Sequence, residues 1–292
     1  MTDDERLAER FEEQRGRLRA VAYRMLGSMS EADDAVQETW LRLGRVDAAE
    51  IENLGGWLTT VIGRICLNML RSRTTRREDP LDGYVPDPIV DPPSGIDPEH
   101  EVLLADSVGL ALLIVLEMLS PAERLAFVLH DMFGVPFEEI ADILQRSPAA
   151  TRQLASRARR RVHGATPPPS DLNRQREVVD AFFAAARGGS MVELVALLDP
   201  DVVLRSDSGT KSGARILMRG AEKVAGSALI FRDSSREVLP ALVNGGAGVV
   251  ITSRGRPIVI MGFTISEGRV VAISGLGDLR RIARVDLSFL EA

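Results

Sequence analysis

The chain has very little lysine, cysteine or histidine, and each shortage limits what it can do. Only two lysines occur, Lys211 and Lys223, so arginine carries almost all of the positive charge. The single cysteine, Cys66, excludes an internal disulfide framework and fits the reducing cytoplasm. All three histidines lie in the first 163 residues, so the rest of the chain has no imidazole for general acid–base catalysis.

Long apolar runs and a signal peptide are also missing. The N-terminal MTDDERLAER is acidic, unlike a secretory signal. The most apolar stretch, residues 108–116, is bounded by Asp106 and Glu117 and is far too short to span a bilayer. We therefore expect a buried helix there, and a cytoplasmic protein with no membrane partner.

Acidic residues outnumber basic ones, but the basic residues are concentrated in two places. The formal net charge is −6. Residues 62–77 and 145–163 each hold a group of arginines and no acidic residue. Two local cationic patches in an acidic chain predict contact with nucleic acid at two places and a different partner elsewhere.

Residues 136–161 have the pattern of a helix-turn-helix. Apolar residues recur at helical spacing in the first half, and a short turn follows. Ser147 and Pro148 are then typical of the cap and first residue of a second helix, which we expect to run to about Val162. The arginine-rich outer face of that helix suits the DNA major groove. An ordinary helical hairpin with a solvated basic face is the alternative.

Composition divides the chain into five segments. Residues 5–77 and 99–163 are predicted to be almost entirely helical. Residues 78–98, rich in Pro, Asp and Gly, predict an extended, flexible linker between them. A second linker, rich in Pro, covers residues 164–170. Over residues 171–292, helices followed by β-like runs predict a separate α+β domain.

Two motifs carry a resemblance to a known family. The pattern ADDAVQETWLRL, followed by GWLTTVIGRICLNMLRS, resembles region 2 of the extracytoplasmic-function (ECF) group of sigma-70 factors. Residues 116–162, where SPAERLAFVLHDMFG precedes the helix-turn-helix, resemble region 4 of the same group. Both occur in the family's order and spacing. Membership implies a non-enzymatic protein that joins bacterial RNA polymerase core and directs it to promoters.

In this family, the late helix of region 2 and the loop before it read the promoter −10 element. Cationic and stacking groups favour opening of the duplex by holding the separated strand, and a pocket offsets the cost of flipping a base. The resemblance implies a −10 contact set of Asn53, Trp57, Arg64, Asn68, Arg71 and Arg73. Trp57 also lies among apolar residues, so core packing is its alternative role.

The acidic helix over residues 31–43 predicts a surface for the polymerase. An exposed acidic face is often only solvated, but in this family the corresponding helix docks on a coiled coil of the largest polymerase subunit. The flap of the core enzyme is a further expected contact. The residues implied for the core are Asp33, Asp34, Gln37, Glu38 and Arg42.

The second helix of the helix-turn-helix is expected to read the −35 element. Outward residues near its N-terminus are best placed for base edges, and other arginines for phosphates. The predicted −35 set is Arg146, Ser147, Thr151, Arg152, Ser156, Arg157 and Arg160.

The segment after residue 170 resembles the SnoaL-like domain of polyketide cyclases, an α+β cone of the NTF2-like type. Some sigma factors of this group carry this domain with a DGGGK motif in it and a WLPEP motif in the linker. Residues 207–211 (DSGTK) and 84–88 (YVPDP) keep part of each motif. The resemblance implies a regulatory role that replaces a separate anti-sigma protein, with contacts from Tyr84, Pro86, Asp207 and Lys211.

The sequence thus predicts a multidomain chain, with two all-α domains followed by an α+β SnoaL-like cone. The cone offers room for a small apolar ligand. We expect no metal, no cofactor and a monomer when free. Two alternatives are a one-component regulator, which would bind duplex DNA tightly without polymerase, and an enzyme fused to a DNA-binding module, against which the missing histidine argues.

Overall fold

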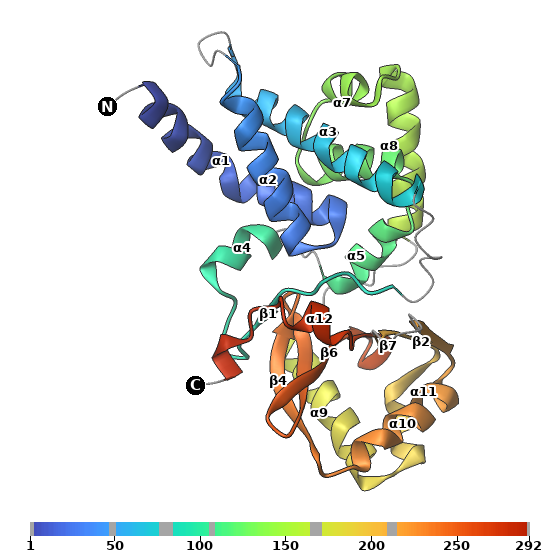
Figure 1. The fold of residues 1–292 in the computed structure, drawn as a ribbon. Helices are drawn as coiled ribbons and strands as arrows, with labels where there is room; N and C mark the ends of the chain where they lie inside the picture. The colour runs from blue at the N-terminus through green and yellow to red at the C-terminus, as the bar shows by residue number, and fades with distance from the viewer. Residues whose placement is uncertain are drawn as a thin grey trace. The chain divides into compact units, whose positions relative to one another are not determined.

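Helices make up the first half of the described chain and a seven-stranded sheet dominates the second (Figure 1). The computed structural model describes residues 3–46, 51–75, 84–104, 109–163, 171–208 and 215–290. It divides into two units. The first comprises Met1–Pro80, Pro98–Asp106 and Val115–Ala165, and the second comprises Leu81–Asp97, Ser107–Ile114 and Thr166–Ala292.

The first unit is helical, as the apolar periodicity predicts. Its long helices carry apolar stripes that pack on one another, and the rings of Phe11 and Trp40 contact each other at an interplanar angle of 56°, with centroids 4.9 Å apart. The elements are α1 (Asp3–Leu26), α2 (Met29–Leu43), α3 (Leu54–Thr75), α4 (Pro98–Leu104), α6 (Pro121–Phe127), the π-helical turn η2 (Val128–Met132), α7 (Phe137–Leu144) and α8 (Pro148–His163). The expected buried helix is α5 (Leu110–Glu117), and the boundary between the units falls inside it.

The two helical segments predicted as separate domains belong to one unit. The Arg124 side chain on α6 is buried, and it donates to the Met25 carbonyl at the end of α1 (2.8 Å) while pairing with Glu117 (2.7 Å). Gly63 on α3 lies so close to α6 and α7 that a Cβ atom there would touch Leu125 and its neighbours at 3.5 Å. Helices from both segments therefore share a single core.

The prediction of a flexible linker over 78–98 is wrong for the part that the structure describes, residues 84–97. Val85, Ile89 and Val90 are buried, and β1 (Val90–Asp91) pairs antiparallel with β4 (Arg236–Val243). The short apolar residues between the prolines supply this burial. Proline is tolerated because β1 is an edge strand of two residues and needs few backbone donors. The Pro-rich linker at 164–170 lies outside the described residues.

The second unit is a curved mixed sheet covered by helices. The remaining strands are β2 (Leu198–Asp207), β3 (Arg215–Arg219), β5 (Gly246–Ser253), β6 (Arg256–Ser266) and β7 (Arg269–Leu276). The strand order is β1-β4-β5-β6-β7-β2-β3, with β2 and β7 parallel and every other pair antiparallel. A tight turn joins β6 to β7, where Glu267 and Gly268 both take positive φ and Ser266 pairs with Arg269.

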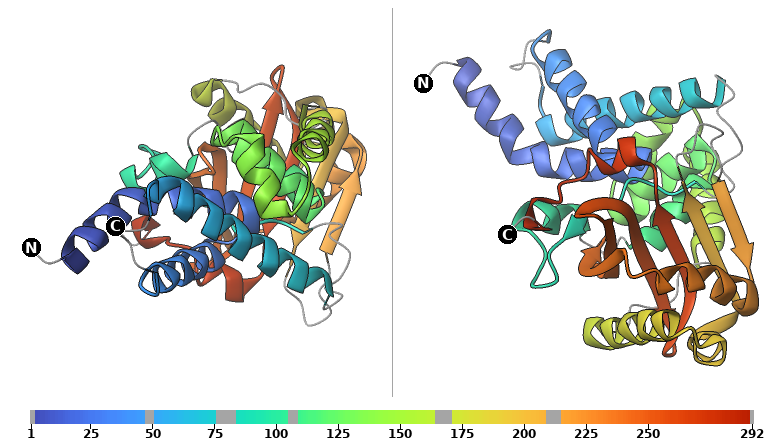
Figure 2. Two further views of the ribbon diagram at one scale, coloured as in Figure 1. Left: turned by 90° about the horizontal axis from the view of Figure 1, so that it is seen from above. Right: turned by 60° about the horizontal axis from the view of Figure 1, so that its bottom comes forward.

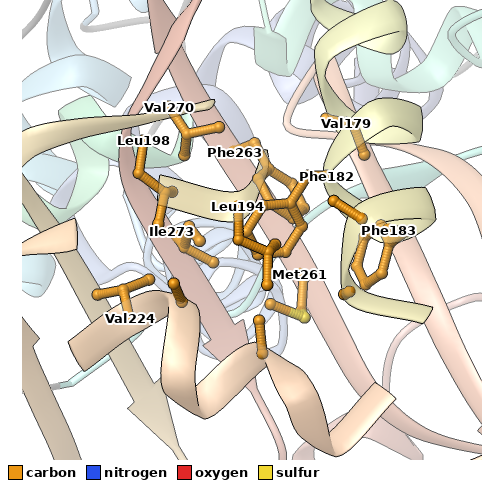
Figure 3. Packing of buried hydrophobic residues seen from close by; sticks show 14 of the residues in the cluster. Val179, Phe182, Phe183, Leu194, Leu198, Val224, Met261, Phe263, Val270 and Ile273 are labelled. Carbon is orange, nitrogen blue, oxygen red and sulfur yellow. The ribbon is translucent and has the colours of Figure 1, made fainter. Parts of the chain in front are cut away.

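Aromatic side chains fill the space between the helices and the sheet of this unit. The helices are α9 (Leu172–Gly188), α10 (Met191–Leu197), α11 (Ala221–Ala228) and the short α12 (Leu279–Ile282). In Figure 2, α9 lies against one side of the strands, which it contacts at β5 and β6. Phe182 and Phe183 point from α9 towards Phe263 on β6, with edge-to-face centroid distances of 5.7 and 5.9 Å (Figure 3). These rings form the centre of a continuous apolar core.

The Arg124–Glu117 pair generates a stability prediction. Replacing Arg124 with Ala is expected to lower the free energy of unfolding by about 3–5 kcal/mol, because Glu117 is left buried without its partner. The double variant Arg124→Met with Glu117→Leu should recover most of that loss, since no charge stays buried. Urea unfolding followed by circular dichroism measures both. Arg42→Ala, which breaks the exposed pair with Glu38, is the control and should cost less than about 1 kcal/mol. An equal cost for both single variants would contradict the prediction.

Candidate nucleic-acid interface

The helix-turn-helix is formed by α7 and α8, with the caps that the sequence predicts. Gln145 adopts the left-handed conformation (φ 54°) that ends α7, and its N–H donates to the Ala141 carbonyl. The Ser147 hydroxyl then accepts the Ala150 N–H at 3.2 Å, and α8 begins at Pro148. Backbone capping thus fixes the angle at which the second helix leaves the turn.

Glu123 on α6 holds α8 in place through two ion pairs. It forms a capping box with Ser120 at the start of α6, and its carboxylate also pairs with Arg157 (3.3 Å) and Arg161 (3.1 Å) on α8. Burial works to raise the pKa of Glu123, but hydrogen bonds from Ser120 and the charges of Arg161 and Arg157 lower it below its usual value. The carboxylate therefore stays charged and holds both guanidinium groups.

Thr151 is a correction to the predicted −35 set. It was expected to face outward, but its side chain is fully buried and its hydroxyl donates to the Ser147 carbonyl at 3.1 Å. Thr151 lies three and four residues before Leu154 and Ala155, so it belongs to the inward stripe of α8. The remaining predicted residues are exposed: Arg146, Ser147, Arg152, Ser156, Arg157 and Arg160.

Gln153 is exposed on the same helix, although the predicted −35 set does not include it. It lies three and four residues before Ser156 and Arg157, so the three side chains are neighbours on one face. Helical spacing alone could have identified Gln153 as exposed, because it lies outside the apolar stripe of α8. Beside it, Arg152 pairs with Glu138 (2.8 Å) and lies over the Phe137 ring, 5.6 Å from its centroid.

The predicted −10 residues divide into an exposed face and a structural part. Arg64, Asn68 and Arg71 are exposed at helical spacing on α3. Arg73 is partly buried, because it donates to the Leu26 carbonyl at 3.1 Å and pairs with Glu31. Trp57 is also partly buried.

Asn53 lies beside a polar cavity of about 290 Å³. Its side-chain oxygen accepts the Gly56 N–H at 3.1 Å, so it caps α3. The cavity is also lined by Arg10 and Gln14 of α1, which sequence reasoning missed because a single sequence does not show that α1 meets the start of α3. A Cβ atom on Gly56 would come within 2.8 Å of the Asn53 amide nitrogen, so only glycine at this position leaves space for that amide.

The predicted polymerase residues lie along one side of α2. Asp34 and Gln37 are exposed, while Asp33 pairs with Arg19 at 2.6 Å. Glu38 and Arg42 pair with each other at 2.9 Å. Leu41 lies between them in sequence and is 48% exposed, so this surface combines acidic and apolar contacts.

Two of the predicted regulatory residues, Tyr84 and Asp207, contact Arg281, which sequence reasoning missed. Arg281 donates to Asp87 (2.6 Å), Asp207 (2.9 Å) and the Val85 carbonyl (2.6 Å). Its guanidinium also lies 4.9 Å from the centre of the Tyr84 ring. Pro86, which lies between Val85 and Asp87 in the sequence, is buried. Lys211 lies outside the described residues.

Other predictions concern metals, the membrane and the thiol. Among the described residues, no group of three or more His, Cys, Asp or Glu side chains is placed to hold a metal ion. No helix in the described ranges is both long and apolar enough to cross a membrane. Cys66 is buried, and burial raises the pKa of its thiol to about 12.

Comparison with known proteins matches both helical segments. The Sigma-70 region 2 family model matches residues 10–76, and the Sigma-70 region 4 model matches residues 110–162. ECF RNA polymerase sigma factor SigJ of Mycobacterium tuberculosis is 42% identical over 220 residues, covering 73% of this chain and 69% of that protein. A probable ECF RNA polymerase sigma factor, SigI of the same species, is 36% identical over 258 residues and covers 87% of each chain.

The likeness to SigJ extends to the three-dimensional fold. The crystal structure of M. tuberculosis SigJ superposes with a TM-score of 0.75 at 34% identity, and covers 96% of this chain and 99% of that one. This confirms the predicted fold class, two helical sigma regions followed by an α+β SnoaL-like cone. The chain belongs to the ECF group of sigma-70 family RNA polymerase sigma factors.

Proposed function

We propose that this chain joins bacterial RNA polymerase core and directs it to promoters by reading a −10 and a −35 element. The observation that carries this proposal is the presence of both sigma regions in one chain, each with a polar helix face exposed. Run-off transcription with purified core polymerase tests it. Tight promoter binding by the protein alone would instead favour a one-component regulator.

The arrangement of the first unit supports a requirement for core polymerase. Helix α3 packs on α6 and α7, so the two candidate reading surfaces are held on a single body. Promoter elements lie several turns of DNA apart, so reading both at once requires these helices to separate. Binding to the core enzyme can supply the free energy for that separation, because a ligand shifts an equilibrium towards the state that it prefers.

We assign −35 reading to Arg152, Gln153, Ser156 and Arg157, with phosphate contacts from Arg146 and Arg160. Four exposed residues on two successive turns near the N-terminus of a helix match the way a recognition helix meets base edges. In this assignment Gln153 replaces Thr151, because Thr151 is buried and a glutamine side chain can form a bidentate contact with adenine.

The pair Gln153 and Thr151 gives a direct test. Gln153→Ala is expected to reduce discrimination at one −35 position by about 1–3 kcal/mol, the value of a good bidentate base contact. Thr151→Val keeps the buried shape and should leave base preference unchanged. Run-off transcription from a pool with a randomised −35 element measures both. A changed preference for Thr151→Val together with an unchanged one for Gln153→Ala would refute the assignment.

We assign the polar cavity beside Asn53 to an unpaired base of the −10 element, with Arg64, Asn68 and Arg71 along the separated strand. A flipped base needs polar partners that offset the cost of unstacking, and the Asn53 amide lies at such a cavity. The exposed arginines of α3 can follow the phosphates.

Asn53→Ser separates capping from base contact. Serine can still cap α3, so thermal stability should stay near that of the parent protein, whereas Asn53→Ala should cost about 0.5–2 kcal/mol. Both variants lose the amide donor, so promoter opening should fall by about fivefold, the equivalent of one hydrogen bond. Permanganate reactivity of unpaired thymines measures opening. Opening by Asn53→Ser at the parental level would exclude the amide contact.

We infer that the second unit regulates transcription by holding residues 84–91. These residues belong to the segment that connects the two sigma regions in sequence, and Arg281 binds their Asp87 side chain and Val85 carbonyl. A docked segment is fixed in length and direction, so docking limits how far the two regions can separate. The proposal assigns no catalytic role to this unit. Its apolar ligand and the monomeric state stay predictions.

Arg281→Gln is expected to release this segment. Hydrogen exchange at the Ile89 amide, which donates to the Asn244 side chain, should become faster, and run-off transcription should rise, because the connection between the regions is no longer fixed to the sheet. Arg284→Gln, a change of an exposed arginine on the same short segment, is the matched control. Faster exchange with no rise in transcription would separate docking from regulation.

A further inference from the structure

A cavity of about 530 Å³ lies at one end of the sheet in the second unit. It opens where α10 ends, where β2 and β7 begin, and where β3 passes into α11. It shares no residue with the candidate promoter, polymerase or linker contacts. Its volume falls within the range of small-molecule sites, roughly 300–1,000 Å³.

An irregularity in the sheet shapes one wall of this cavity. Leu198 on β2 pairs with Val270 on β7, and the next pair joins Val203 to Ala272, so residues 199–202 bulge out of the ladder. Pro200 in this bulge lines the cavity. Gly220 donates to the Val202 carbonyl at 2.9 Å, which brings the turn between β3 and α11 against the bulge. Such bulges commonly lie next to functional sites.

Three cationic side chains line the cavity. Arg219, Lys223 and Arg269 come from three different elements, and in the described part of the chain none of them has an ion-pair or hydrogen-bond partner. Glu222 is the one acidic residue of the lining, so the local charge is positive. This contrasts with α8, where Arg152, Arg157 and Arg161 all pair with glutamates.

The backbone adds to this positive charge. Helix α11 begins at the cavity, and its N-cap Gly220 supplies no side chain to accept the first N–H groups. The first turn of a helix with uncapped N–H groups favours a negative charge. It reinforces the three cations, which provide most of the attraction.

The other side of the cavity is apolar. Val195, Leu198 and Ala221 form this part of the lining. We propose that the cavity binds a small organic anion, with a phosphate or carboxylate head held by Arg219, Lys223 and Arg269 and an apolar body against Val195, Leu198 and Ala221. The SnoaL-like unit would then take its ligand at this end of the sheet and leave its aromatic core intact.

Titration calorimetry on the full-length protein tests the proposal with n-hexyl phosphate and hexanoate as probes. At least one of the two should bind at a single site, and the tighter one identifies the head group. Hexanol has the body without the charge, and inorganic phosphate has the charge without the body, so each should bind at least about tenfold more weakly. Binding of hexanol or inorganic phosphate as tightly as the better probe would overturn the proposal, as would no binding by either probe.

Variants locate the site. The triple variant Arg219→Gln, Lys223→Gln and Arg269→Gln should weaken the better probe by at least about tenfold, while Arg256→Gln, which alters an exposed arginine outside the cavity, should bind like the parent. Ala196→Trp keeps all three cations and fills the opening, so it should also weaken binding. All of these side chains are exposed, and equal melting temperatures would show that the variants fold. Unchanged affinity in both the triple variant and Ala196→Trp would exclude this cavity.

Discussion

The buried guanidinium of Arg124 is the contact on which the arrangement of the sigma regions depends. It lies at the start of region 4, pairs with Glu117 at the end of α5, and donates to the carbonyl of Met25 at the end of α1. A charge buried this deeply requires its partners, because the cost of removing it from water is several kcal/mol. The α1, α5 and α6 ends are therefore held together as long as the charge stays buried.

This dependence also gives the contact two outcomes. Packed, Arg124 joins the helices of regions 2 and 4 into one unit. In the separation proposed above, Arg124, Glu117 and the Met25 carbonyl would all regain water, so breaking the contact would cost less than deleting one partner. A buried ionic contact thus suits the proposed separation better than an equally large apolar contact would.

Local signals in the sequence predicted the helix-turn-helix well, because its caps depend on neighbouring residues. Ser147, Pro148 and the turn at Gln145 specify where α7 ends and α8 begins. Thr151 was misplaced for a related reason: a threonine is compatible with either face, and only the register of Leu154 and Ala155 decides between them. Where distant segments meet leaves no trace in one sequence: Arg281 contacts Asp87, and Gln14 lines the same cavity as Asn53.

The segment over residues 84–97 shows the same limit more sharply. Composition alone describes a chain rich in Pro, Asp and Gly as extended, and extended it is. Whether an extended segment is free depends on its partner. Here β4 offers an edge, and Asn244 accepts the Ile89 N–H. Arg281 pairs with Asp87, an acidic residue that composition alone would place in solvent. Three contacts outside the segment convert a linker into an edge strand.

The SnoaL-like unit keeps its apolar core and its charged groups in different places. Phe182, Phe183 and Phe263 meet edge to face between α9 and the sheet, and this packing contributes to the stability of the sheet. The interior between α9 and the sheet is lined by apolar side chains. Polar chemistry is then left to the periphery of the sheet: Arg281 holds the linker, while Arg219, Lys223 and Arg269 surround a separate cavity. Because these charged residues lie outside the apolar core, changing them leaves the packing of Phe182, Phe183 and Phe263 in place.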